Sequence, residues 1–220
     1  MMKKSKRSDV DPFIVMDVME SARIAEEKGK DIIHMEVGQP GTPAPKIAKD
    51  YITNEINKSN LGYTVSLGLP ALRTKISKLY GDWYNLDLNP NRIVVTTGSS
   101  GAFILSFSAL FDSGDRVGIG SPSYPSYRQI LKSLSLETVD IQTKLQNRFQ
   151  PVPEDITDNN LNGILVASPA NPTGSMLDKQ SLENLINTAN ENNVSFISDE
   201  IYHGIQYENN PTSALEITDN

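Results

Sequence analysis

Cysteine is absent from the 220-residue sequence, which excludes disulfide bonds, thiolate metal ligands and cysteine nucleophiles. The two histidines, His34 and His203, are too far apart in the chain to form a zinc-binding motif, and we expect no metal site. No run approaches the roughly 18–20 apolar residues of a membrane span. The basic start carries Asp9 and Asp11 where a signal peptide would need an apolar run. We therefore expect a soluble, cytoplasmic protein with no membrane partner.

Basic residues are also missing from the last part of the sequence. The chain has 20 Lys and Arg against 27 Asp and Glu, a formal net charge of −7, which argues against a nucleic-acid partner. None of the basic residues lies after Lys179, whereas seven acidic residues do. This imbalance has two interpretations: an acidic surface, or a chain that stops before its compensating bases. The acidic residues concerned are Glu183, Glu191, Asp199, Glu200, Glu208, Glu216 and Asp219.

The remaining composition, with 38% hydrophobic residues, 14 Gly and 13 Pro, is typical of a globular protein. Helix and strand patterns alternate along the chain, which predicts right-handed crossovers and an α/β fold with a mostly parallel sheet. A Gly- and Pro-rich segment, residues 38–46, is a candidate domain boundary. We expect helices over residues 14–28, 45–57, 70–84, 102–111, 124–134 and 182–189, strands over residues 92–97, 116–120, 137–141, 163–168 and 194–198, and a polar loop over residues 146–158.

Ligands of open α/β sheets bind beyond the carboxyl ends of the strands, and four features of the sequence lie there. The first is the segment Gly98-Ser99-Ser100, between the predicted strand 92–97 and the next helix. Its small residues and hydroxyls, together with a helix N-terminus, suit a phosphate group. The segment matches neither glycine-rich nucleotide motif. A ligand site and an ordinary capped turn both remain open for it.

The other three features follow later strands. Tyr124, in a loop with two prolines, is either a flat platform for an aromatic ligand or a packing tyrosine. Asn171 belongs to an Asn-Pro turn and is either a carboxamide ligand or part of a purely structural turn. Asp199 closes a strand, and a carboxylate there needs a partner, either a lysine or arginine or the N-terminus of a helix that it caps. Its neighbour Glu200 is predicted to be solvated.

Together and in this order, these segments resemble the class I/II aminotransferases, the aspartate-aminotransferase-like enzymes of fold type I that use pyridoxal 5′-phosphate (PLP). The resemblance runs from about Asp11 to the end of the chain. It implies a three-layer α/β/α large domain over residues 46–220, preceded by an N-terminal arm and small-domain segment over residues 1–45. The segments that carry the resemblance are PFIVMDVM, VGQP, YTVSLGLPALR, VVTTGSSGA, SPSYPSY, SPANPTG and SDEIY.

The resemblance also implies which residues bind the cofactor. Gly98, Ser99 and Ser100 would hold the PLP phosphate, and Tyr124 would stack on the pyridine ring. Asp199 would pair with the ring nitrogen, whose protonated form an opposite charge favours. A protonated ring then accepts the electron pair that is left when the substrate loses a proton.

Four further roles follow from the resemblance. Asn171 and Tyr202 would bind the phenolic oxygen of PLP, so that Tyr202 joins Asp199 as a candidate catalytic residue. Gly38, together with Asn171, would lie by the substrate. Tyr63 would reach the cofactor phosphate of a neighbouring subunit, which implies a homodimer with shared active sites.

The sequence departs from the family at one decisive position. In the family, the lysine that forms the Schiff base follows the Asp199 segment by some tens of residues, but the last lysine here is Lys179. Two arginines of the family, for the phosphate and for the substrate carboxylate, also have no counterpart. We therefore interpret the chain as the N-terminal fragment of an aminotransferase that moves an amino group between an L-amino acid and a 2-oxo acid, inactive by itself. The alternatives are other PLP chemistry, such as that of a C–S β-lyase, and a non-catalytic PLP-binding module.

Overall fold

The computed structural model describes residues 3–39 and 41–218. The contacts divide the chain into two compact units, each of which is described by itself. The smaller unit is Pro12–Leu69, and the larger unit contains the described residues before Pro12 and those from Pro70 onward. This division does not test the predicted domain limits, 1–45 and 46–220, which stay a prediction.

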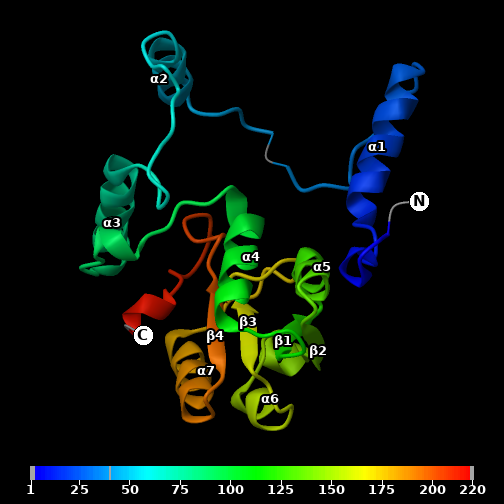
Figure 1. The fold of residues 1–220 in the computed structure, drawn as a ribbon, viewed down its shortest axis with the longest axis vertical. Helices are drawn as coiled ribbons and strands as arrows, with labels where there is room; N and C mark the ends of the chain where they lie inside the picture. Colours follow the sequence, from blue (N-terminus) through cyan, green and yellow to red (C-terminus); the bar gives the residue numbers. More distant parts are fainter. Residues whose placement is uncertain (1–2, 40, 219–220) are drawn as a thin grey trace. The chain divides into compact units, whose positions relative to one another are not determined.

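The smaller unit consists of two helices, α1 (Ile14–Glu27) and α2 (Lys46–Ile56), joined by irregular chain (Figure 1). Both helices lie within the ranges expected from the sequence. The end of α1 is also confirmed: Gly29 follows the last turn with φ +79°, a conformation that glycine adopts without steric cost. Neither helix contains a buried residue, so the apolar faces of both lie open within this unit.

The larger unit is built on a parallel sheet of four strands in the order β2-β1-β3-β4. The strands are β1 (Arg116–Ser121), β2 (Glu137–Gln142), β3 (Gly163–Ala167) and β4 (Ser195–Asp199). Helices α5 (Ser126–Ser133), α6 (Pro153–Thr157) and α7 (Lys179–Glu191) connect them, and α3 (Pro70–Tyr84) and α4 (Gly98–Leu110) come before. Short 3₁₀ helices lie at Lys6–Ser8, Pro90–Arg92, Leu145–Asn147 and Ala214–Glu216. The predicted α/β class is thereby confirmed.

Helices cover both faces of the sheet, which gives three layers (Figure 1). On one face, Phe107 of α4 and Leu131 of α5 are fully buried against the strands. On the other face, Leu185 of α7 packs with residues of α6. Successive strand residues alternate between these layers: Ile164 belongs to the α6–α7 core and Leu165 to the α4–α5 core. A strand buried on both faces explains why β3 is an uninterrupted apolar run.

The strand predicted over residues 92–97 is wrong. Residues Pro90–Arg92 form a 3₁₀ helix, in which the Asn89 side chain accepts a hydrogen bond from the Asn91 backbone at 2.9 Å. The backbone is extended at Ile93, but no strand in the described part of the chain pairs with this segment. Val94 is 52% exposed. An apolar extended segment becomes a strand only when a partner supplies the ladder, and the local pattern carries no information about that partner.

Smaller differences concern helix limits and burial. α4 begins at Gly98 rather than at residue 102, α5 begins at Ser126 because Pro125 precedes it, and the predicted loop 146–158 contains α6. The limits of α3 agree with the prediction, but its apolar face is open: Leu72 is 42% exposed and Trp83 is 51% exposed. No helix in the described residues is long and apolar enough to span a bilayer.

Candidate functional site

Three of the candidate residues lie where parallel strands end. Tyr124 follows β1, Asn171 follows β3, and Asp199 is the last residue of β4. Asp199 is in register with Ala167, the last residue of β3. The loops after β3 and β4 therefore begin side by side, at the edge of the sheet where α/β proteins bind ligands.

The first turn of α4 lies toward the same edge of the sheet. The other end of α4 lies by the start of β3, because the Phe111 ring occupies the place where a Cβ on Gly163 would be (Figure 1). No side chain caps the N-terminus of α4, so its first backbone N–H groups have no acceptor within the helix. Ser99 and Ser100 thus present backbone donors and hydroxyls, as an anion site requires, whereas the Gly98 N–H already donates to the Thr96 backbone oxygen at 2.9 Å.

Asp199 is a buried carboxylate, 8% exposed, whose described partners are neutral donors. Its Oδ2 accepts a hydrogen bond from the Tyr127 hydroxyl at 2.5 Å, and its Oδ1 accepts one from the Ile201 backbone at 3.1 Å. Within the described part of the chain, Asp199 neither pairs with a lysine or arginine nor caps a helix, so these two protein partners considered from the sequence were wrong. Burial, and then the bond to Asp199, raise the pKa of Tyr127 above its ordinary range, which keeps this hydroxyl protonated as a donor.

Tyr127 also contacts the predicted ring platform. Its ring packs edge-on against Tyr124, with centroids 5.5 Å apart and planes at 79°. On its other side it packs against Phe103 of α4, at 5.2 Å and 82°. One side chain thus connects the residue proposed for the cofactor ring face with the carboxylate proposed for the ring nitrogen. In the sequence, Tyr127 appeared only as the last residue of the segment SPSYPSY and was given no role, because the motif does not show that its hydroxyl reaches Asp199.

Asn171 and Tyr202 lie together, as expected of two residues with one common ligand atom. The Asn171 Nδ2 donates to the Tyr202 hydroxyl at 3.1 Å. Because this hydroxyl accepts from Asn171, its own proton is free to be donated to another acceptor. The pair therefore offers a fixed hydroxyl donor between the loops that follow β3 and β4.

Gln150, a second residue given no role from the sequence, binds the two ends of the loop that carries Asn171. Gln150 is 3% exposed, and its Nε2 donates to the backbone oxygens of Ala167 and Ser175, both at 3.1 Å. These two carbonyls lie on either side of the loop, so one carboxamide closes its base. Nothing in the local sequence marks this glutamine, which lies in a segment predicted only as polar loop.

Two candidates belong to the smaller unit. Gly38 and Tyr63 are both exposed there, Tyr63 fully. Their predicted roles, by the substrate and at a neighbouring subunit's cofactor, stay predictions.

Glu200 corrects a further expectation. It is not solvated: its side chain is 15% exposed and accepts three hydrogen bonds. The donors are the Ser198 hydroxyl at 2.9 Å, the Ser213 hydroxyl at 2.9 Å and the Ala214 backbone at 2.7 Å. Glu200 thereby anchors the segment around residue 213 to the end of β4, which is a structural role.

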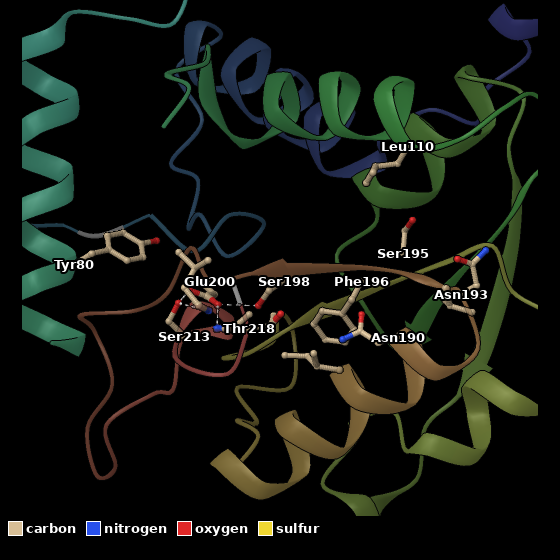
Figure 2. A pocket seen from close by; sticks show the side chains of 14 residues that line it. Tyr80, Leu110, Asn190, Asn193, Ser195, Phe196, Ser198, Glu200, Ser213 and Thr218 are labelled. Atoms are coloured by element: carbon tan, nitrogen blue, oxygen red, sulfur yellow. Dashed lines mark hydrogen bonds between the residues drawn. The ribbon is translucent and has the colours of Figure 1, made fainter. Parts of the chain in front are cut away.

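A cavity of about 560 Å³ lies along β4 (Figure 2). Figure 2 shows Phe196 on the α7 side of the strand and Leu110 of α4 on the opposite side. None of the candidate residues lines this cavity, which follows the strand edge that lies away from β3. A hollow of only about 20 Å³ lies by the candidate site and is lined by Tyr127 and Asn171 among others. The large cavity is therefore an open sheet edge, and the chemistry of the small hollow, rather than its size, marks the site.

Known proteins are similar to this chain in sequence and in fold. A family model described as aminotransferase class I and II matches residues 30–219. A valine–pyruvate aminotransferase of Mycobacterium tuberculosis is 40% identical over 94% of this chain and 54% of its own length. Among solved structures, a proposed aminotransferase from Silicibacter pomeroyi is 58% identical with a TM-score of 0.89, covering 99% of this chain and 56% of the other.

An aspartate aminotransferase from Thermus thermophilus, solved with maleate, has a TM-score of 0.91 at 27% identity, over 99% of this chain and 58% of the other. The chain thus spans about half the length of the relatives that it matches. The family match covers most of the chain, and the expected fold type is confirmed by these structures. The chain belongs to the class I and II aminotransferases.

Proposed function

We propose that this chain forms the cofactor-binding part of a PLP-dependent transaminase that moves an amino group between an L-amino acid and a 2-oxo acid. The family depends on PLP. The observation that carries the proposal is the environment of Asp199: a buried carboxylate with two neutral donors and no cation among the described residues. A buried charge of this kind is costly unless an opposite charge compensates it, and a protonated pyridine nitrogen is such a charge.

The other residues fit the remaining groups of PLP. The uncapped N-terminus of α4, with Ser99 and Ser100, suits the phosphate. Tyr124, braced edge-on by Tyr127, offers a ring face, and the Tyr202 hydroxyl next to Asn171 offers a donor to the phenolic oxygen. All of these lie at the carboxyl ends of the strands. When bound, PLP supplies an electron sink for the substrate.

Each of these side chains has a task that its chemistry allows. Asp199 keeps a proton on the ring nitrogen, because an ionised carboxylate favours the cation beside it. Tyr202 and Asn171 would direct hydrogen-bond donors at the phenolic oxygen, and these donors are already in place and need no reorganisation. The phosphate anchor at α4 would help to hold the ring where Tyr124 and Asp199 can reach it.

The substrates and the assembly are part of the same proposal. The relatives are named for different amino acids, valine and aspartate, so their names do not select one for this chain. The proposed assembly is a homodimer with shared sites, in which Tyr63 serves the partner's cofactor. The open apolar residues of α4, such as Leu105 at 58% exposure, support a further covering layer on this helix.

PLP binding by the 220-residue chain tests the proposal. Asp199→Asn keeps the size of the side chain and removes its charge, so we expect PLP affinity to fall about 10- to 100-fold. The matched control is Asp140→Asn, which removes a β2 carboxylate that forms an ion pair with Arg128 of α5 and should leave affinity unchanged. Equal affinities of wild type and Asp199→Asn in equilibrium dialysis would contradict the assignment of Asp199.

We expect no amino transfer by this chain alone. Lys179 is exposed at the first position of α7, so its ammonium is solvated rather than held against a bound cofactor, as a Schiff-base lysine must be. Borohydride reduction with PLP, followed by peptide mapping, should give scattered and sub-stoichiometric labelling. A single fully labelled lysine with conversion of an amino acid to a 2-oxo acid would contradict this expectation.

A further inference from the structure

His203 has a buried side chain, 5% exposed, with partners on both ring nitrogens. Its Nε2 lies 2.9 Å from the backbone oxygen of Ser168, and its Nδ1 lies 2.6 Å from the Tyr84 hydroxyl. The imidazole and the Tyr84 ring pack at 5.8 Å between centroids. The charged group that faces the ring is Glu200, whose Oε2 lies 3.8 Å from Nδ1.

The two partners decide where the ring proton lies. A backbone carbonyl can only accept, so Nε2 must carry a proton to form the bond to Ser168. In the neutral imidazole Nδ1 then has a lone pair and accepts from the Tyr84 hydroxyl. Burial, and then Glu200, raise the pKa of Tyr84 to about 12, so that this hydroxyl remains a donor at neutral pH. The arrangement thus fixes one tautomer and one ring orientation.

The bond from Nε2 ends at the start of the loop that carries Asn171. Ser168 is the first residue after β3, and its backbone N–H donates to the backbone oxygen of Asp199 at 3.1 Å. Its hydroxyl accepts from the Leu177 backbone at 2.9 Å. The peptide group that His203 binds is thus already tied to β4 and to the far end of the loop, which leaves the carbonyl as the remaining attachment point.

His203 itself follows Tyr202 directly in the chain. The loops after β3 and β4 are therefore joined twice: by the side-chain pair Asn171–Tyr202 at 3.1 Å and by the His203–Ser168 bond. We infer that His203 is a positioning residue, which holds Asn171 and Tyr202 at the spacing that a common ligand atom requires. This inference rests on the proposed function for the identity of that ligand, but not for the geometry.

Tyr84 extends this role to α3. The other side-chain hydrogen bonds of α3 among the described residues are local: Arg73 and Ser77 bind backbone oxygens of Pro90 and Leu88. The Tyr84–His203 bond alone reaches a residue far along the chain. The helix that follows the smaller unit is thus connected through one imidazole to the loops of the candidate site.

The chain offers a direct measurement, because it contains only two histidines. The ¹⁵N shifts of the imidazole rings distinguish the two tautomers, and the variant His203→Gln assigns the signals. In the wild-type chain without PLP we expect His203 as the Nε2–H tautomer with a slowly exchanging ring proton. The opposite tautomer would overturn the inference, since Nε2 could then not donate to Ser168.

Variants test the effect on Asn171. His203→Leu removes both bonds, and we expect the Asn171 side-chain amide to exchange with water about tenfold faster. His203→Gln can still donate to Ser168 and should remain close to wild type. The control His34→Gln changes the other histidine, in the smaller unit, and should have no effect. Unchanged exchange in folded His203→Leu would overturn the inference; if that variant does not fold, the wild-type tautomer and the His203→Gln result decide.

PLP gives a second readout, which a purely structural role would not move. In His203→Leu the phenolic group of bound PLP should ionise about one pH unit closer to its free value, because its donors are no longer fixed. His203→Gln should restore the wild-type midpoint, and an identical midpoint in His203→Leu would count against the inference. Failure of the wild-type chain to bind PLP would contradict the proposed function instead, while the exchange data on Asn171 would still decide the role of His203.

Discussion

Asp199, the last residue of β4, and Glu200, which follows it, are neighbouring carboxylates with opposite surroundings. Glu200 accepts three hydrogen bonds, two of them from the segment around residue 213. Asp199 points to the α4–α5 side, where it accepts one bond from Tyr127 and one from the backbone. Neither is paired with Lys or Arg among the described residues. A carboxylate with a full set of donors has a structural role, whereas one with spare acceptor capacity in a buried place is suited to a ligand.

The largest effect on stability should come from Glu200. Glu200→Ala leaves the Ser213 hydroxyl and the Ala214 N–H without their acceptor and detaches this segment from β4. We expect a loss of about 3 kcal/mol in the free energy of unfolding, measured by urea denaturation. Glu200→Gln keeps one acceptor oxygen and should cost about 1 kcal/mol. If Glu200→Ala lowered the free energy of unfolding by less than Glu200→Gln does, the contrast drawn between the two carboxylates would be wrong.

Asp199 should respond in the opposite way to the same measurements. Asp199→Asn retains one oxygen for the Tyr127 hydroxyl or the Ile201 N–H and removes an uncompensated buried charge. We expect its free energy of unfolding to stay within about 1 kcal/mol of wild type, although its affinity for PLP falls. A large loss of stability without a change in PLP affinity would make Asp199 a structural residue like Glu200.

The sequence was sufficient for the fold because alternating patterns of apolar residues determine local structure. All four strands, and the helices α5 and α7, were expected to within a few residues, whereas α6 lies in a segment that was predicted as a loop. The strand over residues 92–97 failed, because strand pairing depends on a partner that the local pattern does not contain. The candidate site shows the same limit: Asp199, Asn171 and Tyr202 were proposed from their motifs, whereas Tyr127 and Gln150, which bind Asp199 and the Asn171 loop, were given no role.

The partners explain these failures in physical terms. Glu200 was expected to be solvated because its donors, at residues 213 and 214, come from a segment with no recognisable motif. Asp199 was expected to pair with a lysine or arginine or to cap a helix, but it accepts a hydrogen bond from a neutral hydroxyl 72 positions away in the chain. Whether a polar group is buried depends on the whole fold, so a local motif does not reveal which distant residues will form hydrogen bonds with it.

Tyr127→Phe would sharpen the comparison further. The substitution removes the hydroxyl from Asp199 and keeps the ring contacts to Tyr124 and Phe103. We expect the free energy of unfolding to fall by about 1 kcal/mol, since one buried hydrogen bond is lost. The free energy of PLP binding should weaken by a similar amount. The control is Tyr207→Phe, because Tyr207 is fully exposed. If both variants behaved alike, the Tyr127 hydroxyl would have no part in holding Asp199.

The smallest effect concerns His34, whose side chain is 46% exposed and which has two carboxylate partners. In the smaller unit His34 lies 2.6 Å from Glu36 and 2.9 Å from Glu26, and these bonds raise its pKa to about 9. Because the folded-state pKa lies above the ordinary value of about 6.5, the stabilisation is complete below pH 6.5 and is lost as the pH rises toward 9. An NMR titration of the His34 ring should show the raised midpoint, which added salt lowers because the pair is exposed. His34→Gln should abolish the corresponding slope in stability over this range, and a midpoint near 6.5 in the wild-type chain would show that the two glutamates do not hold the ring in solution.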